Sequence, residues 1–191
     1  MHLPFPTIQS KNLYFRPFRT ADAAHVFTLF SDKETMMFDG GETLHNMQEA
    51  YQFIKAYSTF YPGITAIRWA VEWRRDGRFL GSCGFHSIDY FHKRAEIGGE
   101  LLKPYRGSGY AIEAMGHLIH FGFQSLGLNR LTAMISTRNK NAISLIEKSP
   151  FQFEGCLKQW ERWGDHWEDL NVYRLLRKEW MMKSPYNAFN E

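Results

Sequence analysis

The sequence is most informative at residues 101–114, where it runs Leu101-Leu102-Lys103-Pro104-Tyr105-Arg106-Gly107-Ser108-Gly109-Tyr110-Ala111-Ile112-Glu113-Ala114. The apolar beginning is typical of the end of a strand, and the part after Gly109 is typical of a helix, so the loop between them holds the glycines and the cations. Glycines let backbone N–H groups converge, and the first turn of a helix carries about half a unit of positive charge. The segment therefore predicts an anion-binding loop, with Lys103 and Arg106 adding mobile positive charge at its rim.

The same loop is also compatible with a plain tight turn, in which Arg106 is an exposed surface charge. Two other nucleotide-binding motifs are excluded by what the loop lacks. It has neither the third glycine and downstream acidic residue of a dinucleotide fold nor the Gly-Lys-Ser/Thr of a P-loop. The loop alone leaves the anion site and the structural turn open.

Periodicity around this loop predicts the remaining elements. We expect helices at residues 21–30, 43–57, 109–123 and 139–148, and strands at residues 13–18, 67–74, 79–85, 94–102, 130–136, 153–163 and 167–176. Asp76-Gly77 predicts a hairpin between the second and third strands, and the last two strands are expected to form another around Gly164-Asp165. The strand-helix-strand unit around helix 109–123 requires parallel pairing, whereas the hairpins pair antiparallel. The prediction is an α/β fold with a mixed sheet and helices on both faces.

Composition limits the class of protein. The chain has 191 residues, 44 % of them hydrophobic, and no stretch approaches the roughly 20 apolar residues of a membrane span. We expect one domain over residues 1–191, located in the cytoplasm because Met1 to Ser10 lack the features of a signal peptide. Cys83 and Cys156 are expected to be free, buried thiols. The net charge of +3 suits an anionic small ligand as well as weak nucleic-acid contact.

The loop resembles the acyl-CoA signature of the GNAT acetyltransferases, Arg/Gln-x-x-Gly-x-Gly/Ala, which is present here from Arg106 to Ala111. Further resemblance, to the ribosomal-protein N-terminal (RimJ/RimL-like) branch, is carried by Ala95-Glu96-Ile97-Gly98, by Asn139-Lys140-Asn141-Ala142 and by Asp169 in the last hairpin. The resemblance extends from Leu13 to Trp180. It implies the GNAT fold, a sheet of about seven strands with a splayed, bulged fourth strand.

The chain departs from the branch at three places. Ala142 stands where that branch often has serine, and Ser149-Pro150 replaces the usual Leu-Gly. Gly99-Glu100 replaces an aromatic pair that is common after the Glu-Ile-Gly motif. These departures affect the acceptor pocket and any role of the serine hydroxyl.

The resemblance implies a reaction, in which an acetyl group passes from acetyl-CoA to a primary amine by direct attack in a ternary complex. The amine is a protein N-terminus or a small molecule. The Gly98-Gly99 pair marks a bulge or a backbone approached closely by something else, and a bulge would splay the strand and expose donors near Leu101 and Leu102. The predicted coenzyme-binding residues are Leu101, Leu102, Arg106, Gly107, Ser108, Gly109, Tyr110, Ala111 and Asn139. Asn139 serves equally well as a helix N-cap.

Three glutamates are candidate general bases, since a carboxylate in a cleft has its pKa raised toward the working range. Glu96 is the first choice, because it matches a fourth-strand glutamate used as base in some members of the family. Strand alternation places Glu100 on the same face unless the bulge interrupts it. Glu161 matches an acidic position on the acceptor side. A solvated charge or an ion pair is the alternative for each of them. Asp169 is expected to be structural.

Two other functions compete with the enzyme. A non-catalytic acyl-CoA sensor would keep the loop and lose the chemistry, and Ala142 favours it modestly. A nucleic-acid adaptor is disfavoured, because the net charge is low and the basic residues are dispersed. No metal, membrane or direct nucleic-acid partner is expected. A homodimer is left open.

Overall fold

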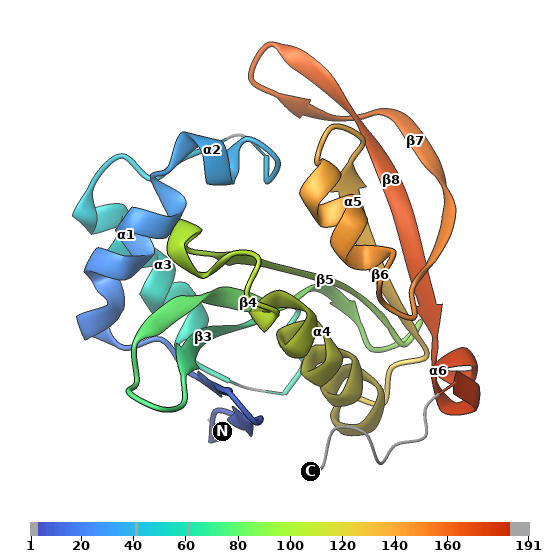
Figure 1. Cartoon of the computed structure of the whole chain (residues 1–191), viewed down its shortest axis with the longest axis horizontal. Coiled ribbons are helices and arrows are strands. Elements are labelled where there is room, and N and C mark those ends of the chain that lie inside the picture. The colour runs from blue at the N-terminus through green and yellow to red at the C-terminus, as the bar shows by residue number, and fades with distance from the viewer. Residues whose placement is uncertain (1–3, 41, 61, 184–191) are drawn as a thin grey trace.

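The computed structural model describes residues 4–40, 42–60 and 62–183. It contains one eight-stranded sheet with the strand order β1-β2-β3-β4-β5-β6-β8-β7. Strands β3 to β8 of this sheet are labelled in Figure 1. The strands are β1 Ile8–Gln9, β2 Leu13–Arg16, β3 Ile67–Trp73, β4 Phe79–Asp89, β5 Arg94–Leu101, β6 Arg130–Ser136, β7 Gln152–Trp163 and β8 His166–Leu176. The α-helices are α1 Ala23–Phe30, α2 Lys33–Met36, α3 Met47–Tyr57, α4 Tyr110–His120, α5 Lys140–Ile146 and α6 Arg177–Lys183.

The sheet is mixed, as the sequence predicts. Strands β5 and β6 are parallel and are connected through α4, whereas the other neighbouring strands pair antiparallel. Both predicted hairpins are present: β3 with β4 around Gly77, and β7 with β8 around Gly164. Gly77 has a φ of 75°, which glycine adopts without the strain that a side chain would cause. The sheet has one strand more than the predicted seven, because β1 adds an edge.

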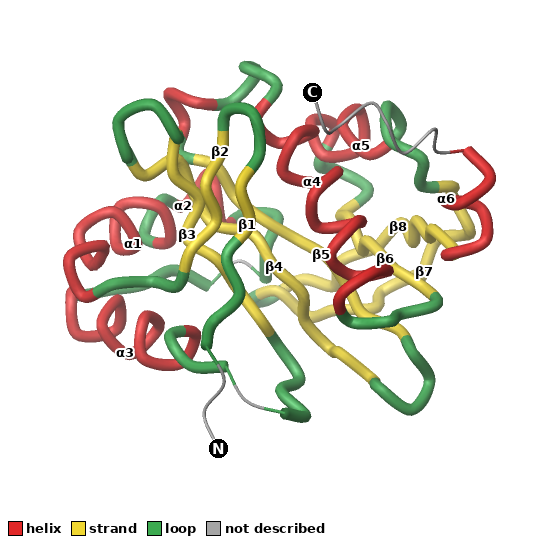
Figure 2. The backbone as a smooth tube through the Cα atoms, turned by 90° about the horizontal axis from the view of Figure 1, so that it is seen from below, coloured by secondary structure: helices red, strands yellow, loops and turns green. Residues whose placement is uncertain are grey.

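Two clusters of buried apolar side chains lie on the two faces of the sheet. Residues of α1, α2 and α3 form one cluster, which includes Val26, Leu29 and Ile54. Residues of α4, α5 and α6 join the other, which includes Leu118, Ile146 and Trp180. Figure 2 shows α1 and α3 on one side of the strands and α4 on the other. The prediction of helices on both faces is confirmed.

Strands β5 and β6 separate along their length. Their pairing covers only Arg94–Glu96 against Arg130–Thr132, at the beginning of both strands. Beyond this point β5 stays paired with β4 as far as Leu101, while β6 stays paired with β8 as far as Ser136. The sheet therefore opens between the second halves of β5 and β6, which is the expected splay.

The expected bulge at Gly98-Gly99 is wrong. The register between β4 and β5 is one-to-one through both glycines, and the irregularity of this pair falls between His86 and Asp89. The glycines are instead sites of close approach. A Cβ at Gly99 would lie 2.6 Å from the Cβ of Cys83, and a Cβ at Gly98 would lie 3.0 Å from the Nε2 atom of His86. The unbroken alternation keeps Glu96 and Glu100 on one face.

Some helix boundaries differ from the predicted ones. Helix α1 begins at Ala23, later than predicted, because residues 20–22 form a 3-10 turn before it. Helix α3 begins later than predicted, where the Asn46 side chain accepts a hydrogen bond from the Glu49 amide at 3.0 Å. Helix α4 ends at His120 and continues as a π-helical turn, Phe121–Ser125. The short elements α2 and β1 gave no periodic signal, since four and two residues are too few to establish one.

A carboxylate fixes the beginning of α4 to the N-terminal segment. Glu113 accepts hydrogen bonds from the Ser10 hydroxyl at 2.7 Å, from the Asn12 amide N–H at 2.9 Å and from the Asn12 side chain at 2.8 Å. Contacts with residues about 100 positions away hold the first turn of α4 in place.

Within the part of the chain that the structure describes, no helix is both long and apolar enough to cross a bilayer.

Candidate functional site

The loop before α4 has bare backbone. Gly107 and Gly109 have φ values of 75° and 83°, and a Cβ added to either would meet no atom within 4 Å. The first hydrogen bond of the helix runs from the Glu113 amide to the Gly109 carbonyl at 3.1 Å. The amides of residues 110–112 therefore have no acceptor inside the helix. The loop offers backbone donors and the positive end of a helix dipole to an anion.

A cavity of about 140 Å³ lies where β5 and β6 separate. Its walls come from β5 at Ile97–Leu101, from α4 at Ala111, Ala114, Met115 and Leu118, from β6 at Ala133 and Ile135, and from α5 at Ala142, Leu145 and Ile146. Val71, Ser82 and Cys83 complete the lining. The walls are mainly apolar, and one end reaches the helix that the glycine loop opens. This shape suits an elongated ligand with an anionic group at the loop.

The structure distributes the predicted coenzyme-binding residues over the cavity wall, the adjoining loop and the beginning of α5. Leu101 and Ala111 line the cavity. Arg106, Gly107, Ser108 and Gly109 are exposed in the adjoining loop, and Tyr110 is half-buried at the start of α4. Asn139 caps α5, since its side chain accepts the Ala142 amide at 3.0 Å.

The prediction for Leu102 is corrected. Its amide was expected to be a free donor, but it donates to the Leu80 carbonyl at 2.9 Å. Its side chain faces a second cavity, of about 250 Å³, between the loop and residues 28–35. The reason is the missing bulge: β5 continues its ladder with β4 through Leu101, so the next amide is also used.

The two loop cations are not free in this structure. Lys103 pairs with Asp32 at 2.9 Å and with Glu34 at 2.8 Å. Arg106 donates to the Leu101 carbonyl at 3.0 Å and to the Thr35 hydroxyl at 2.6 Å. Both side chains therefore hold α2 and its N-cap against the loop. The expectation of mobile charge at the rim is corrected, because α2 was not predicted from the sequence.

Glu100 is the predicted glutamate that reaches the cavity. Its side chain is 11 % exposed and forms an ion pair with Arg68 of β3. Burial raises the pKa of Glu100 to about 7; the Arg68 guanidinium lowers it, and the nearby Asp39 carboxylate raises it further. Arg68 also donates to the Ser82 hydroxyl at 2.6 Å. A carboxyl group with this pKa can exchange a proton near neutral pH.

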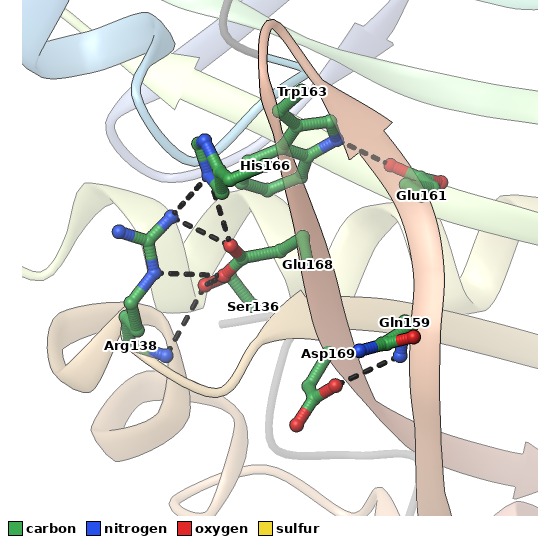
Figure 3. Close-up of polar contacts among 8 residues, drawn as sticks. All are labelled: Ser136, Arg138, Gln159, Glu161, Trp163, His166, Glu168 and Asp169. Carbon is green, nitrogen blue, oxygen red and sulfur yellow. Dashed lines mark hydrogen bonds and ion pairs between the residues drawn. The ribbon is translucent and has the colours of Figure 1, made fainter.

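Glu96 and Glu161 lie outside the cavity lining. Glu96 is half-buried and stands opposite His86 on β4 and Thr132 on β6. Glu161 is exposed on β7, where it accepts a hydrogen bond from the indole N–H of Trp163 at 2.8 Å (Figure 3). The structure thus brings one of the three predicted glutamates to the cavity.

Asp169 has the structural role that the sequence predicts. It accepts the Gln159 amide at 2.8 Å and pairs with Lys158 at 2.8 Å. Gln159 has a φ of 48° at the irregularity in β7 between Leu157 and Glu161, so Asp169 stabilises a strained backbone position.

Cys83 is buried as predicted, but Cys156 is exposed. Within the described ranges, no group of three or more His, Cys, Asp and Glu side chains is placed to hold a metal ion.

Sequence reasoning missed two charged residues near the cavity, Arg68 and Glu168. Arg68 interrupts the apolar run of β3 between the buried Ile67 and Trp69, which is a signal for a partly buried charge. Glu168 is two positions before the buried Leu170, so strand alternation places both on the same face. In each case the pattern indicates an unusual environment but does not identify the partner.

The sequence and fold are similar to those of known acetyltransferases. Residues 12–152 match the acetyltransferase (GNAT) domain. The chain is 32 % identical over 173 residues to the uncharacterized N-acetyltransferase YoaA of Bacillus subtilis (strain 168), covering 91 % of this chain and 98 % of YoaA. It is also 32 % identical over 99 residues to the ribosomal-protein-serine acetyltransferase of Escherichia coli (strain K12), covering 52 % of this chain and 55 % of that protein.

A solved structure shows the same fold at lower identity. The spermidine N-acetyltransferase of Vibrio cholerae, in complex with CoA and spermine, superposes with a TM-score of 0.79 at 19 % identity, covering 89 % of this chain and 98 % of that one. Together with the splayed mixed sheet and the glycine loop, the domain match shows that this chain belongs to the GNAT family of acetyltransferases.

Proposed function

We propose that this chain transfers an acetyl group from acetyl-CoA to a primary amine by direct attack. The observation that carries the proposal is the continuity of two features: the loop of bare amides at Gly107–Ala111 and the apolar cavity between β5 and β6. An acyl-CoA has an anionic diphosphate at one end and a narrow, largely apolar arm that ends in the thioester. The two features match these two parts of the molecule.

The residues present fit the coenzyme. The open space around Gly107 and Gly109 would accommodate the diphosphate, and the first-turn amides of α4 would donate to it. Leu101, Ala111 and Ala142 would flank the arm, and Asn139 would lie at its edge. When bound, acetyl-CoA supplies an activated acyl group. The protein's own contribution is to align that group with the amine and to exclude water.

We assign the role of general base to Glu100 in preference to Glu96 and Glu161. Most amines are protonated at neutral pH, so the attacking nitrogen must first lose a proton. Glu100 has a pKa of about 7 and lines the cavity, which suits removal of that proton. Glu96, the first choice from the sequence, lacks this access and is the alternative.

A covalent enzyme intermediate is disfavoured by the one thiol in the cavity. Burial raises the pKa of Cys83 to about 12, so this side chain is a neutral thiol at physiological pH. The acetyl group therefore passes directly to the amine, with Glu100 holding the proton that the amine releases. Ala142 provides no hydroxyl at the cavity wall. Protonation of the leaving thiolate thus falls to Glu100 or to water.

The acceptor is proposed to be either a protein N-terminal amine or a small cationic amine. The similarity to the ribosomal-protein-serine acetyltransferase supports the first, and the fold shared with the spermidine acetyltransferase is compatible with the second.

The single eight-stranded sheet supports one domain. A non-catalytic acyl-CoA sensor remains the second candidate, favoured by the absence of a hydroxyl at Ala142.

The decisive experiment measures binding and turnover separately. Calorimetry with CoA should show binding to the wild-type protein, and Arg106→Glu should abolish it by placing a negative charge at the loop. Thiol release is then followed with acetyl-CoA and a panel of N-terminal peptides, polyamines and aminoglycosides. Release with any panel member supports the enzyme. Binding without release on the whole panel supports the sensor, and absence of binding rejects both.

A further inference from the structure

Glu168 lies in a charged cluster next to the cavity. The residue belongs to β8 and its side chain is 3 % exposed. It accepts hydrogen bonds from Arg138, from Nε at 3.0 Å and from Nη2 at 2.6 Å, and another from the Ser136 hydroxyl (Figure 3). His166 Nε2 lies 3.4 Å from the Glu168 carboxylate and 3.0 Å from Arg138 Nη2. A buried carboxylate with this many donors is firmly oriented.

Two partners of Glu168, Ser136 and Arg138, belong to the junction between β6 and α5. Ser136 is the last residue of β6, and its hydroxyl also accepts the Arg138 amide at 3.1 Å. The Ser136 carbonyl accepts the Asn139 amide at 3.0 Å, and Asn139 in turn caps the first turn of α5 through the Ala142 amide. A continuous series of hydrogen bonds therefore runs from the Glu168 carboxylate to Ala142.

Helix α5 forms one wall of the cavity through Ala142, Leu145 and Ile146. It has only seven residues, and so short a helix is not stable by itself. Its position must be imposed by contacts at its ends and on its buried face. Glu168 supplies such a contact at the N-terminal end, although it does not line the cavity.

We propose that Glu168 is a positioning residue for the acyl-CoA site: through Arg138 and Ser136 it holds the first turn of α5 at the distance from β5 that the coenzyme requires. The inference rests on the proposed function, since it concerns the same cavity. Burial alone would raise the pKa of Glu168, but the hydrogen bonds from Arg138 and Ser136 outweigh it and lower the pKa. The charged form is therefore the one that holds α5.

The test compares two carboxylates that pair with arginines at the two ends of the same hairpin. Glu168→Gln removes the charge that holds the junction. Glu154→Gln is the matched control, because Glu154 pairs with Arg130 at the opposite end of β6, with the Nη1 atom at 3.0 Å. In Glu168→Gln we expect amide hydrogen exchange in residues 140–146 to be faster by about tenfold, and the control should leave it unchanged.

Coenzyme affinity provides the second measurement. Calorimetry should show CoA binding weakened by about tenfold in Glu168→Gln and unchanged in Glu154→Gln, because a displaced wall lowers complementarity. In the transfer assay the loss should appear in the KM for acetyl-CoA, with the KM for the amine unchanged. Equal weakening in both variants would mean a general loss of stability and would overturn the inference.

A double variant tests whether Glu168 acts through Arg138. If it does, Glu168→Gln combined with Arg138→Gln binds CoA no more weakly than Glu168→Gln alone. If the loss of CoA affinity in the double variant equalled the product of the two single losses, the proposed connection between Glu168 and Arg138 would be overturned. Unchanged exchange in α5, or faster exchange with unchanged CoA affinity, would overturn the positioning role while leaving the acetyltransferase proposal intact. If the wild-type protein binds no CoA, the proposed function fails instead, and both roles are withdrawn.

Discussion

Burial and an arginine act in opposite directions on Glu100. Burial disfavours the charged carboxylate, whereas Arg68 stabilises it, and the balance leaves a pKa of about 7. A base with this pKa is half deprotonated at neutral pH and can both take up and release a proton. In the proposed reaction the same side chain would therefore combine a structural ion pair with the role of general base.

Glu100→Gln tests the proposed general base. Glutamine keeps the size of the side chain and an acceptor for Arg68 but cannot accept the amine proton. We expect kcat to fall by about 100-fold, the range that general base catalysis contributes, while CoA affinity measured by calorimetry is retained. Glu96→Gln is the control and should change kcat by less than about threefold. The reverse order of effects would return the role of base to Glu96.

The pH profile provides a second test of the same residue. The base works only when deprotonated, and its deprotonated fraction rises as the pH increases through the pKa. The wild-type kcat/KM should therefore rise with pH through about 7 and then level off. Glu100→Gln should lose this rise. An unchanged profile in the variant would show that another group controls it.

Gly99 is required by packing between strands. An added Cβ would lie 2.6 Å from the Cβ of Cys83 and 2.8 Å from the carbonyl oxygen of Ser82. We expect Gly99→Ala to lower the free energy of unfolding by about 1–3 kcal/mol, measured by urea denaturation. Gly155→Ala is the matched control, since a Cβ at that strand position meets no atom within 4 Å. Equal stability of the two variants would contradict the packing argument.

At the scale of elements, the important contact is that of α2 with the loop before α4. Lys103 and Arg106 extend across to Asp32, Glu34 and Thr35. The short α2 therefore has its ends fixed by a loop about 70 residues later in the chain. Helix α4 is fixed in a similar way, because Glu113 binds Ser10 and Asn12.

The glycine loop can be tested apart from backbone strain. Gly109 and Gly127 have φ values of 83° and 64°, and neither has an atom within 4 Å of an added Cβ. Alanine at either position should cost about 1 kcal/mol of stability, since both conformations are left-handed. Only Gly109→Ala should also weaken CoA binding, by about tenfold, because the methyl group enters the space next to the first-turn amides. Calorimetry with both variants provides the comparison, and equal affinities would remove Gly109 from the site.

At the scale of the whole molecule, Glu100 makes stability depend on pH. Its pKa is raised from the ordinary value of 4.5 to about 7 in the folded chain, so the folded state binds more protons than the unfolded state between these values. The contribution of Glu100 to the free energy of unfolding should therefore fall as the pH rises from 4.5 to 7, by roughly 3 kcal/mol. Urea denaturation at pH 5 and pH 8 measures this change. The difference in the free energy of unfolding between the wild type and Glu100→Gln should fall over this pH range. A constant difference would contradict the prediction.

The sheet gives the molecule its functional shape. Because β5 remains with β4 while β6 remains with β8, the sheet is held on both sides of the gap and the cavity persists between them. Helix α4 and helix α5 cover this gap from the same face, as their shared apolar cluster shows. The opening is therefore a property of strand pairing, not of any single side chain.

The sequence by itself determined the local features of this protein. The strand-loop-helix around Gly107 and Gly109, the parallel pairing of β5 with β6 and the hairpins at Gly77 and Gly164 all depend on short-range patterns and turn chemistry, which are encoded in neighbouring residues. The anion-binding loop proposed for the coenzyme is predicted for the same reason, and the coenzyme itself is implied by the family resemblance. Glycine conformation and helix dipoles act within a few residues.

Only the tertiary structure decided which charged groups meet. Glu100 pairs with Arg68, which lies 32 residues earlier in the chain, and Glu168 pairs with Arg138, which lies 30 residues earlier. Arg106 donates a hydrogen bond to the Thr35 hydroxyl, 71 residues earlier. No periodicity in the sequence records such pairs, because strand order and helix packing bring them together. The proposal of Glu100 instead of Glu96 as general base rests on such contacts, since the pKa of a carboxyl group is set by its burial and by its neighbours in space.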